Sequence, residues 1–244
     1  METQTPEELV GLLERPPSPL RYQYNSYEPL EVTGMLGSRV APGSRVLEVG
    51  CGTGAMLSVF RDHSRADVIG IEPDPERVSM ARERGFEVVH GYFDDITASQ
   101  LGTFDVIVFA DVIEHLVDPA PLLMLARRQL RAGGCVIASV PNVAHWTIRL
   151  SLLRGKFDYE PTGLMDATHL RWYTAASLER LFRATGFDTV EFDWTSAHWL
   201  PLYLRIPFRS SIREGGRRRL VRRLVQRWPL LFGFQHVVVA RTTS

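Results

Sequence analysis

Three glycines and a more distant glutamate have the spacing of a cofactor site. Gly50, Gly52 and Gly54 directly follow the run 46–49, Val-Leu-Glu-Val, which is typical of a buried parallel strand. Glycines at such a turn let the backbone bend sharply and approach a ligand before a helix begins. Glu72 ends a second apolar run, eighteen residues after Gly54, where a carboxylate can accept hydrogen bonds from two ribose hydroxyls. This spacing predicts a cofactor that contains adenosine.

Glu48 indicates which cofactor the glycine turn favours. The turn also satisfies a dinucleotide pattern that ends in Ala55, so a nicotinamide-dependent oxidoreductase is the alternative. A carboxylate next to a pyrophosphate would weaken binding, whereas S-adenosylmethionine carries an ammonium and a sulfonium group and no phosphate. With Glu48 two residues before Gly50, the run resembles the first motif, acid-x-Gly-x-Gly-x-Gly, of the class I S-adenosylmethionine-dependent methyltransferases. The resemblance implies that S-adenosylmethionine also lies near Cys51 and Pro73.

Two further groups of cofactor contacts are expected, because ligands of open parallel sheets lie over the carboxyl ends of the strands. The family places an adenine contact after the third strand, often an Asp where this chain has Tyr92. The nearby groups left to stack on or bond to adenine are Phe93, Asp94 and Asp95. After the fourth strand, Ala110 and Asp111 resemble the motif that faces the methionine moiety. A helix N-cap is the alternative for Asp111.

Histidines that follow the later strands are candidates for removing a proton from the methyl acceptor. Methylation of a hydroxyl requires in-line attack on the sulfonium and loss of a proton, and an imidazole with a pKa near neutral suits that task. Asp166 and His169 fit as an orienting acid and a base, with a loop closed by its own hydrogen bonds as the alternative. Glu114 and His115 resemble the Glu-His pair of the ubiquinone-pathway O-methyltransferases, which makes His115 the competing base, with a structural histidine as the alternative.

The segment 142–173 is dense in polar and aromatic side chains that could bind the acceptor. It resembles a bacterial branch of the family, the methyltransferase-23-like group, often found with sugar-nucleotide and polysaccharide enzymes. That resemblance implies a sugar or glycan hydroxyl as acceptor, with a prenylated phenol or a non-catalytic cofactor-binding module as alternatives. We expect no metal, although His145, Asp166 and His169 could bind one. The expected acceptor contacts are Asn142, His145, Trp146, Trp172 and Tyr173.

Apolar runs of strand length alternate with helical patterns as far as residue 142. Such alternation predicts right-handed βαβ units and a Rossmann-like, doubly wound α/β fold. The resemblance implies a mostly parallel seven-stranded sheet with an antiparallel last strand. A chain of 244 residues is compatible with one domain. Its expected parts are an N-terminal helical segment (1–40), a cofactor-binding core (41–142), an acceptor lid (143–173) and an insertion between the last two strands (195–230).

The charge pattern and termini indicate where the protein works. The formal net charge is zero, so no overall field attracts nucleic acid. The segment 199–228 combines apolar residues with the arginine run 217–223, and it could rest on an anionic membrane surface or pack as a helix through Leu220, Leu224 and Val225. Two cysteines and no leader pattern indicate a reducing compartment. We therefore expect a cytoplasmic protein that binds a small-molecule acceptor, peripheral to the inner face of the membrane if the segment 199–228 binds lipid.

Overall fold

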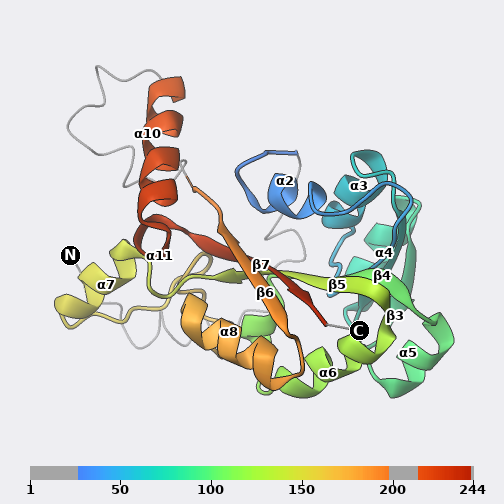
Figure 1. Cartoon of the computed structure of the whole chain (residues 1–244). Helices are drawn as coiled ribbons and strands as arrows, with labels where there is room; N and C mark the ends of the chain where they lie inside the picture. Colours follow the sequence, from blue (N-terminus) through green and yellow to red (C-terminus); the bar gives the residue numbers. More distant parts are fainter. Residues whose placement is uncertain (1–26, 198–213, 243–244) are drawn as a thin grey trace.

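A seven-stranded sheet with the strand order β3-β2-β1-β4-β5-β7-β6 forms the centre of the protein (Figure 1). The computed structural model describes residues 27–197 and 214–242. Strands β1 to β5 pair in parallel, and β7 runs antiparallel to both of its neighbours, β5 and β6. The predicted α/β class and antiparallel last strand are confirmed. The strands are β1 (Arg45–Val49), β2 (Asp67–Glu72), β3 (Glu87–His90), β4 (Phe104–Ala110), β5 (Leu130–Pro141), β6 (Thr189–Trp194) and β7 (Gln235–Arg241).

Helices cover both faces of the sheet, because its central strands are apolar on both sides. One face packs against α2 (Val32–Gly37), α3 (Ala55–Asp62) and α4 (Pro75–Glu83). The other packs against α5 (Asp95–Leu101), α6 (Ala120–Gln129) and α8 (Ala175–Ala184). Side chains cap several of these helices, as when Asp74 accepts hydrogen bonds from the main-chain N–H groups of Glu76 and Arg77.

The remaining helices lie at the edge of the sheet where the parallel strands end. The short η1 (Ile113–His115) follows β4, and α7 (Trp146–Leu153) follows β5. Because β7 is antiparallel, α10 (Glu214–Arg227) and α11 (Pro229–Phe232), which precede it, come to the same edge (Figure 1). The path of the chain therefore gathers η1, α7, α10 and α11 around the end that also carries the glycine turn.

Helix α10 packs through a stripe that agrees only in part with the predicted one. Val221 and Val225 are buried, against Trp146, Trp194 and Phe232, whereas Leu220 is 44% exposed. Residues four apart share a helix face, and the sequence alone did not reveal which face meets the domain. The prediction was therefore wrong for Leu220, whose place Val221 takes, while Val225 is buried and Leu224 half-buried as expected.

The predicted division into parts stays a prediction. Residues 1–26 of the expected N-terminal segment and residues 198–213 of the expected insertion lie outside the described residues. The expected acceptor lid, 143–173, contains α7 and a following loop that returns to the sheet through a bridge between Asn142 and Tyr173.

Candidate active site

The glycine turn after β1 has the backbone that its sequence requires. Gly50, Gly52 and Gly54 have φ angles of 74°, 54° and 79°, in the left-handed region that favours glycine. A Cβ atom on Gly50 would lie 2.8 Å from a methyl group of Val112, whereas one on Gly52 would meet no atom within 4 Å. The turn is therefore crowded at Gly50 and open at Gly52, where a ligand could approach the main chain.

Glu72 lies at the end of β2 beside this turn. Its buried carboxylate accepts hydrogen bonds from the main-chain N–H of Gly52 at 2.8 Å and from that of Asp74 at 3.0 Å. Each carboxylate oxygen can accept a second hydrogen bond. Glu72 is thus held next to the open side of Gly52, beside which the ribose would lie if Gly52 faces the cofactor. Its contact with the ribose stays a prediction.

Glu48 is buried under the turn with an unmet hydrogen-bonding capacity. It is 2% exposed and its Oε2 has no hydrogen-bond partner. Burial, and next the negative charge of Glu72, raise its pKa well above the usual value. A cationic group brought to this carboxylate would relieve both effects, so this unpaired acceptor suits the ammonium group of S-adenosylmethionine.

The side chain of Cys51 belongs to the core and not to the open side of the turn. It packs with Leu57, Val78 and Phe86, and a Cβ on Gly70 would lie 2.5 Å from its sulfur. Burial raises the pKa of the Cys51 thiol. Any contact of Cys51 with the cofactor would therefore come from its main chain.

The residues after β3 have structural roles that the sequence did not reveal. Phe93 is buried in the main core. Asp94 is the N-cap of α5 and accepts a hydrogen bond from the main-chain N–H of Thr97 at 2.8 Å. Asp95 lies on the surface and pairs with Arg128. The capping pattern Asp94-x-x-Thr97 could have indicated α5, and the adenine contacts at these three positions stay a prediction.

Asp111 ties the ends of three strands together. Its Oδ1 accepts hydrogen bonds from the Ser139 hydroxyl at 2.8 Å and from the Gln235 side-chain amide at 2.7 Å. Its backbone is left-handed, with φ at 54°, and the N-cap residue of η1 is Val112. The helix-cap alternative for Asp111 was therefore wrong. Together with half-buried Ala110 at the end of β4, Asp111 is held at the same edge as the glycine turn.

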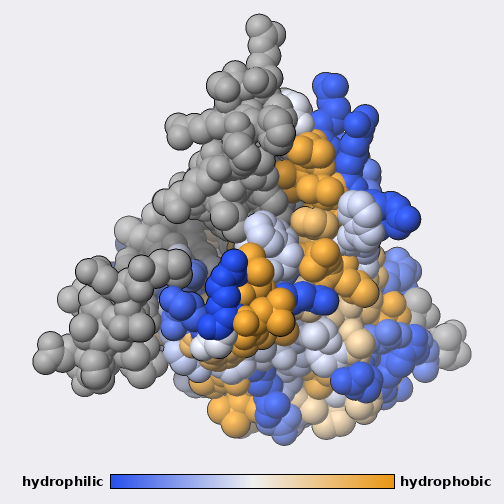
Figure 2. All heavy atoms as spheres, turned by 90° about the vertical axis from the view of Figure 1, so that its left-hand side faces the viewer, coloured by the Kyte–Doolittle hydropathy of each residue, from blue (hydrophilic) through white to orange (hydrophobic). Residues whose placement is uncertain are grey.

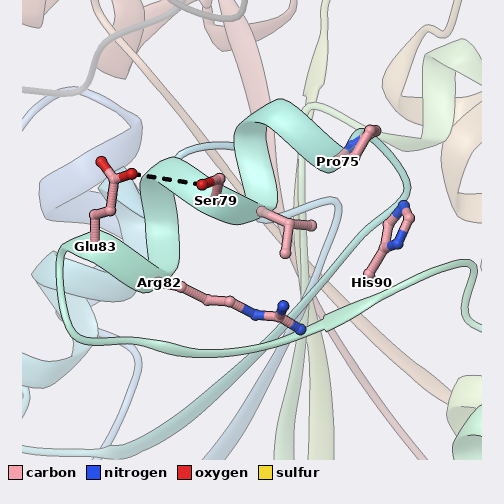
Figure 3. A pocket seen from close by; sticks show the side chains of 6 residues that line it. Pro75, Ser79, Arg82, Glu83 and His90 are labelled. Atoms are coloured by element: carbon pink, nitrogen blue, oxygen red, sulfur yellow. Dashed lines mark hydrogen bonds between the residues drawn. The ribbon is translucent and has the colours of Figure 1, made fainter.

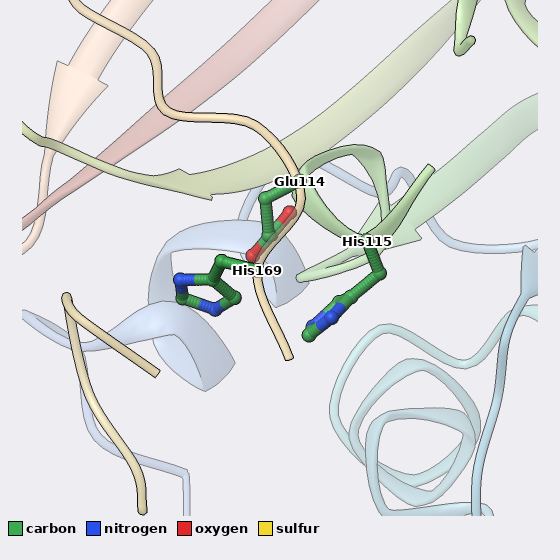
Figure 4. Close-up of side chains that lie close together, drawn as sticks. All are labelled: Glu114, His115 and His169. Carbon is green, nitrogen blue, oxygen red and sulfur yellow. The ribbon is translucent and has the colours of Figure 1, made fainter. Parts of the chain in front are cut away.

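Glu114, His115 and His169 come together beyond Asp111 (Figure 4). One ligand atom from each of them lies within 4.8 Å of the others, and the two imidazole centroids are 4.9 Å apart. The main-chain oxygen of Glu114 accepts hydrogen bonds from the N–H groups of Leu170 and Arg171, at 2.9 and 3.0 Å. These bonds fasten the loop that carries His169 onto η1. The sequence treated the two histidines as competitors, whereas the structure makes them neighbours.

Glu114 is the member of this group that the sequence did not select as a site residue. It is 1% exposed, and neither carboxylate oxygen has a hydrogen-bond partner. Burial raises its pKa well above the usual value, and the nearby Asp111 and Asp166 raise it further. The acid next to the apolar residues Val112 and Ile113 could have indicated Glu114 as a site residue. Buried ionisable groups without partners are costly, and such groups are concentrated at functional sites.

Both histidines are held in the same tautomer. The Nδ1 of His115 lies 3.1 Å from the main-chain oxygen of Thr168, and the Nδ1 of His169 lies 3.3 Å from that of Leu164. A carbonyl oxygen only accepts, so each neutral ring carries its proton on Nδ1 and leaves a lone pair on Nε2. The Nε2 atoms are therefore the basic positions of the site.

Asp166 closes its own loop. Its Oδ1 accepts hydrogen bonds from the main-chain N–H of Thr168 at 2.8 Å and from the Thr168 hydroxyl at 2.7 Å. The same hydroxyl lies 3.3 Å from Nδ1 of His115. Asp166 thus also reaches His115 through Thr168, and its orienting role toward His169 stays a prediction.

Three of the expected acceptor contacts are part of the scaffold. The Asn142 side chain donates a hydrogen bond to the main-chain oxygen of Gly233 at 2.8 Å, and Tyr173 is buried beside it through the bridge to Asn142. Trp146 packs on the buried stripe of α10. These positions join the lid to β7 and α10, and their contact with an acceptor stays a prediction.

His145 and Trp172 have nitrogen atoms with no hydrogen-bond partner, His145 Nε2 and Trp172 Nε1. His145 packs edge-on against Phe234, and burial lowers its pKa to about 4. Trp172 lies against two other aromatic rings, Phe157 at 5.5 Å and Tyr159 at 6.1 Å between centroids. Trp172 is therefore the expected acceptor contact that combines an aromatic cluster with a buried, unpaired N–H donor.

A carboxylate and two imidazoles also suit a divalent transition metal. The structure groups Glu114, His115 and His169 for that purpose, in place of the trio with His145 and Asp166 that the sequence indicated. His169 is the one residue that belongs both to this group and to the three residues indicated by the sequence. The same three side chains can thus exchange protons or bind a cation.

A surface pocket of about 410 Å³ lies elsewhere, between α4 and β3 (Figure 3). Its lining comes from α4 and from the end of β3, and it includes the hydrogen-bonded pair Ser79 and Glu83. None of the site residues predicted from the sequence lines it. We do not assign it to the active site.

Comparison with known proteins supports the same cofactor. A family profile described as a methyltransferase domain matches residues 23–191. The chain is 37% identical over 106 residues to the ubiquinone biosynthesis O-methyltransferase of Xanthomonas oryzae pv. oryzae (strain PXO99A), covering 41% of this chain and 44% of that protein. It is 30% identical over 161 residues to the protein of the same name from Azorhizobium caulinodans, covering 63% and 62% of the two chains. The match therefore spans less than half of the Xanthomonas protein.

Solved structures share the fold. A SAM-dependent methyltransferase from Archaeoglobus fulgidus superposes with a TM-score of 0.58 at 20% identity, covering 86% of this chain and 94% of that one. Phosphoethanolamine N-methyltransferase 2 of Haemonchus contortus, solved with S-adenosyl-L-methionine, gives 0.54 at 16% identity, covering 86% and 51%. These likenesses show a shared fold.

Proposed function

This chain belongs to the class I S-adenosylmethionine-dependent methyltransferases, and we propose that it methylates a hydroxyl oxygen on a ring-containing small molecule. The observation that carries the proposal is the group of Glu114, His115 and His169 at the edge of the sheet that holds the glycine turn. The family excludes the nicotinamide-dependent alternative. The acceptor and the residues that act on it are the proposed part.

Proton removal is the task that the group suits. S-adenosylmethionine, when bound, supplies an electrophilic methyl carbon on a sulfonium. As the hydroxyl oxygen bonds to that carbon, the carbon–sulfur bond breaks and S-adenosylhomocysteine leaves, and the oxygen's proton has to leave near the transition state. In this proposal Nε2 of His169 accepts it, because its Nδ1 is engaged with the main-chain oxygen of Leu164. Once ionised, Glu114 would stabilise the positive charge on the imidazole. His115 is the alternative acceptor of the proton, because its Nδ1 is likewise engaged, with the main-chain oxygen of Thr168.

A phenolic hydroxyl on a lipid-like molecule is the first acceptor class. The relatives from Xanthomonas and Azorhizobium are named ubiquinone biosynthesis O-methyltransferases. The pair Glu114 and His115 resembles the Glu-His pair of that branch. A phenol is a weak acid, so a neutral imidazole can take its proton during methyl transfer. This choice reverses the order of the two acceptor classes that the sequence suggested.

A sugar or glycan hydroxyl is the second class. The observation in its favour is the cluster of Phe157, Tyr159 and Trp172, because flat aromatic faces suit a sugar ring. The same cluster could hold a phenol, and it does not by itself separate the two.

Transfer of a labelled methyl group tests the proposal. The full chain is incubated with S-adenosylmethionine labelled in its methyl group and with separate pools of prenylated phenols, simple phenols, sugar nucleotides and glycolipids. We expect label in an ether of the prenylated phenols. Label in the sugar pools would select the second class, and label only on nitrogen or sulfur acceptors would contradict O-methylation.

A further inference from the structure

One end of the molecule, formed by α7, α10 and α11, exposes an unusual number of large apolar side chains. Figure 2 looks at this end and shows hydrophobic groups interspersed with strongly hydrophilic ones. More than half of the exposed large hydrophobic side chains of the described chain lie here or in the loop after α7. They are Leu150, Leu152, Leu153, Phe157, Leu220, Trp228 and Leu230. We call α7, α10, α11 and this loop the apical face.

The exposed charges of α10 are almost all positive. Arg219, Arg222, Arg223 and Arg227 are exposed and take part in no ion pair among the described residues. Arg218 differs, because it pairs with Glu28 at 2.6 Å. Arg227 also lies over the ring of Trp228, at 5.4 Å from its centroid. The apical face therefore combines unneutralised arginines with apolar side chains that long arginine stems can accompany into an interface.

The exposed side chains of α10 are not needed for packing. The helix is anchored through Val221 and Val225 on Trp146 and Trp194. The ring of Trp146 in turn lies 6.5 Å from that of Phe232 on α11. These contacts join α7, α10 and α11 to one another, so their outward side chains form a fixed surface.

We propose that the apical face rests on an anionic lipid bilayer. A bilayer surface accepts leucine and tryptophan side chains at the level of its acyl boundary and attracts arginines through its headgroups. A nucleic acid would use the arginines but gain little from Leu152 and Leu153. A two-fold dimer through this face would bring the arginines of two copies together, which costs free energy.

Such contact would be peripheral. In the part of the chain that the structure describes, no helix is long and apolar enough to span a bilayer. Helix α7 begins only a few residues after β5 ends, in the same lid that carries His169. Docking through the apical face would therefore bring the lid to the membrane, where a lipid-linked acceptor is held. Binding to the bilayer does not depend on which acceptor is methylated.

Vesicle sedimentation tests the proposal without any measurement of activity. The full chain is mixed with vesicles of phosphatidylcholine alone or of equimolar phosphatidylcholine and phosphatidylglycerol, at low and high salt. We expect sedimentation with the anionic vesicles at low salt and release as salt rises. Equal binding to both kinds of vesicle, or none at low salt, would overturn the proposal.

Two matched variants locate the contact. Arg222→Gln with Arg223→Gln removes two exposed charges from α10 and should weaken partitioning by roughly 25-fold, at about five-fold for each arginine. Arg127→Gln with Arg180→Gln removes two exposed charges from α6 and α8 and should leave it unchanged. Leu153→Ser, at a side chain that is 83% exposed, should also weaken binding without loss of stability.

Several results would place the apical face elsewhere. Unchanged vesicle binding in the Arg222 and Arg223 variant, with circular dichroism showing a folded protein, would refute the bilayer. Binding of labelled RNA that competes with the vesicles would assign the arginines to nucleic acid. A concentration-dependent dimer that Leu153→Ser disrupts would assign the face to a second copy of the chain.

Discussion

Glutamine in place of Glu114 should stabilise the protein, and the gain should grow as the pH rises. Glu114 is buried, both of its carboxylate oxygens lack partners, and burial is the first cause of its raised pKa. In the unfolded chain the pKa of a glutamate is about 4.3. Above that pH the unfolded chain releases a proton that the folded chain still holds. The free energy of unfolding therefore falls with rising pH until the folded carboxyl also ionises.

The size of the effect follows from the buried charge, because the amide of glutamine would find no more hydrogen-bond partners than the carboxyl group does. A buried polar group left without a partner costs about 1–3 kcal/mol, and more when it is charged. Glutamine keeps the shape of Glu114 and carries no charge. We therefore expect Glu114→Gln to raise the free energy of unfolding by about 1–3 kcal/mol near pH 8 and by less than about 0.5 kcal/mol near pH 4.

Urea denaturation of both proteins over this pH range measures the difference. A chelator is included, because a cation on Glu114, His115 and His169 would stabilise the carboxylate and reverse the sign. Glu87→Gln, at an exposed position on β3, is the matched control and should show no such trend. A variant that is less stable than the wild type at pH 8, or a difference that does not change with pH, would refute the reasoning.

Three other predictions concern single residues. Burial lowers the pKa of His236 to about 4, so the unfolded chain gains a proton before the folded chain does as the pH falls below about 6.5. The wild type should therefore lose about 3 kcal/mol of stability between about pH 6.5 and pH 4 that His236→Gln does not lose, as measured by urea denaturation. Glu72→Ala should weaken S-adenosylmethionine binding by about 1.5–3 kcal/mol in calorimetry, and an unchanged Kd in a folded variant would place the ribose acceptor elsewhere. Gly52→Ala should cost about 1–2 kcal/mol of stability through its positive φ and lower cofactor affinity further, because its Cβ would point into open space; full affinity would show that the cofactor does not pass there.

The cofactor half of the site could be predicted because its signals are local. Gly50, Gly52 and Gly54 need left-handed backbone within one turn, and Glu72 follows from the register between β1 and β2. Local pattern also indicated the strands up to residue 142, since alternation of apolar runs and helices repeats within about thirty residues.

The acceptor half could not be predicted in the same way. The meeting of Glu114 with His169 depends on how the loop after α7 returns to η1, through main-chain hydrogen bonds that carry no side-chain signature. Asp94 showed the opposite problem, because an acid after a strand serves equally as a ligand contact or as a helix cap. The sequence predicted that Trp146 contacts the acceptor, whereas its packing against α10 gives it a structural role.

Turnover of the His169→Ala variant tests the central claim most directly. Using the acceptor that the labelling experiment identifies, methyl transfer and S-adenosylmethionine affinity are measured for His169→Ala, for His115→Ala and for His63→Ala, a control at an exposed position after α3. Removal of a general base should lower the rate by about 10²- to 10⁴-fold while leaving the cofactor Kd unchanged. We expect that loss for His169→Ala and wild-type turnover for His63→Ala. Loss only in His115→Ala would move the base to η1, and full turnover in both site variants would contradict proton removal by this group.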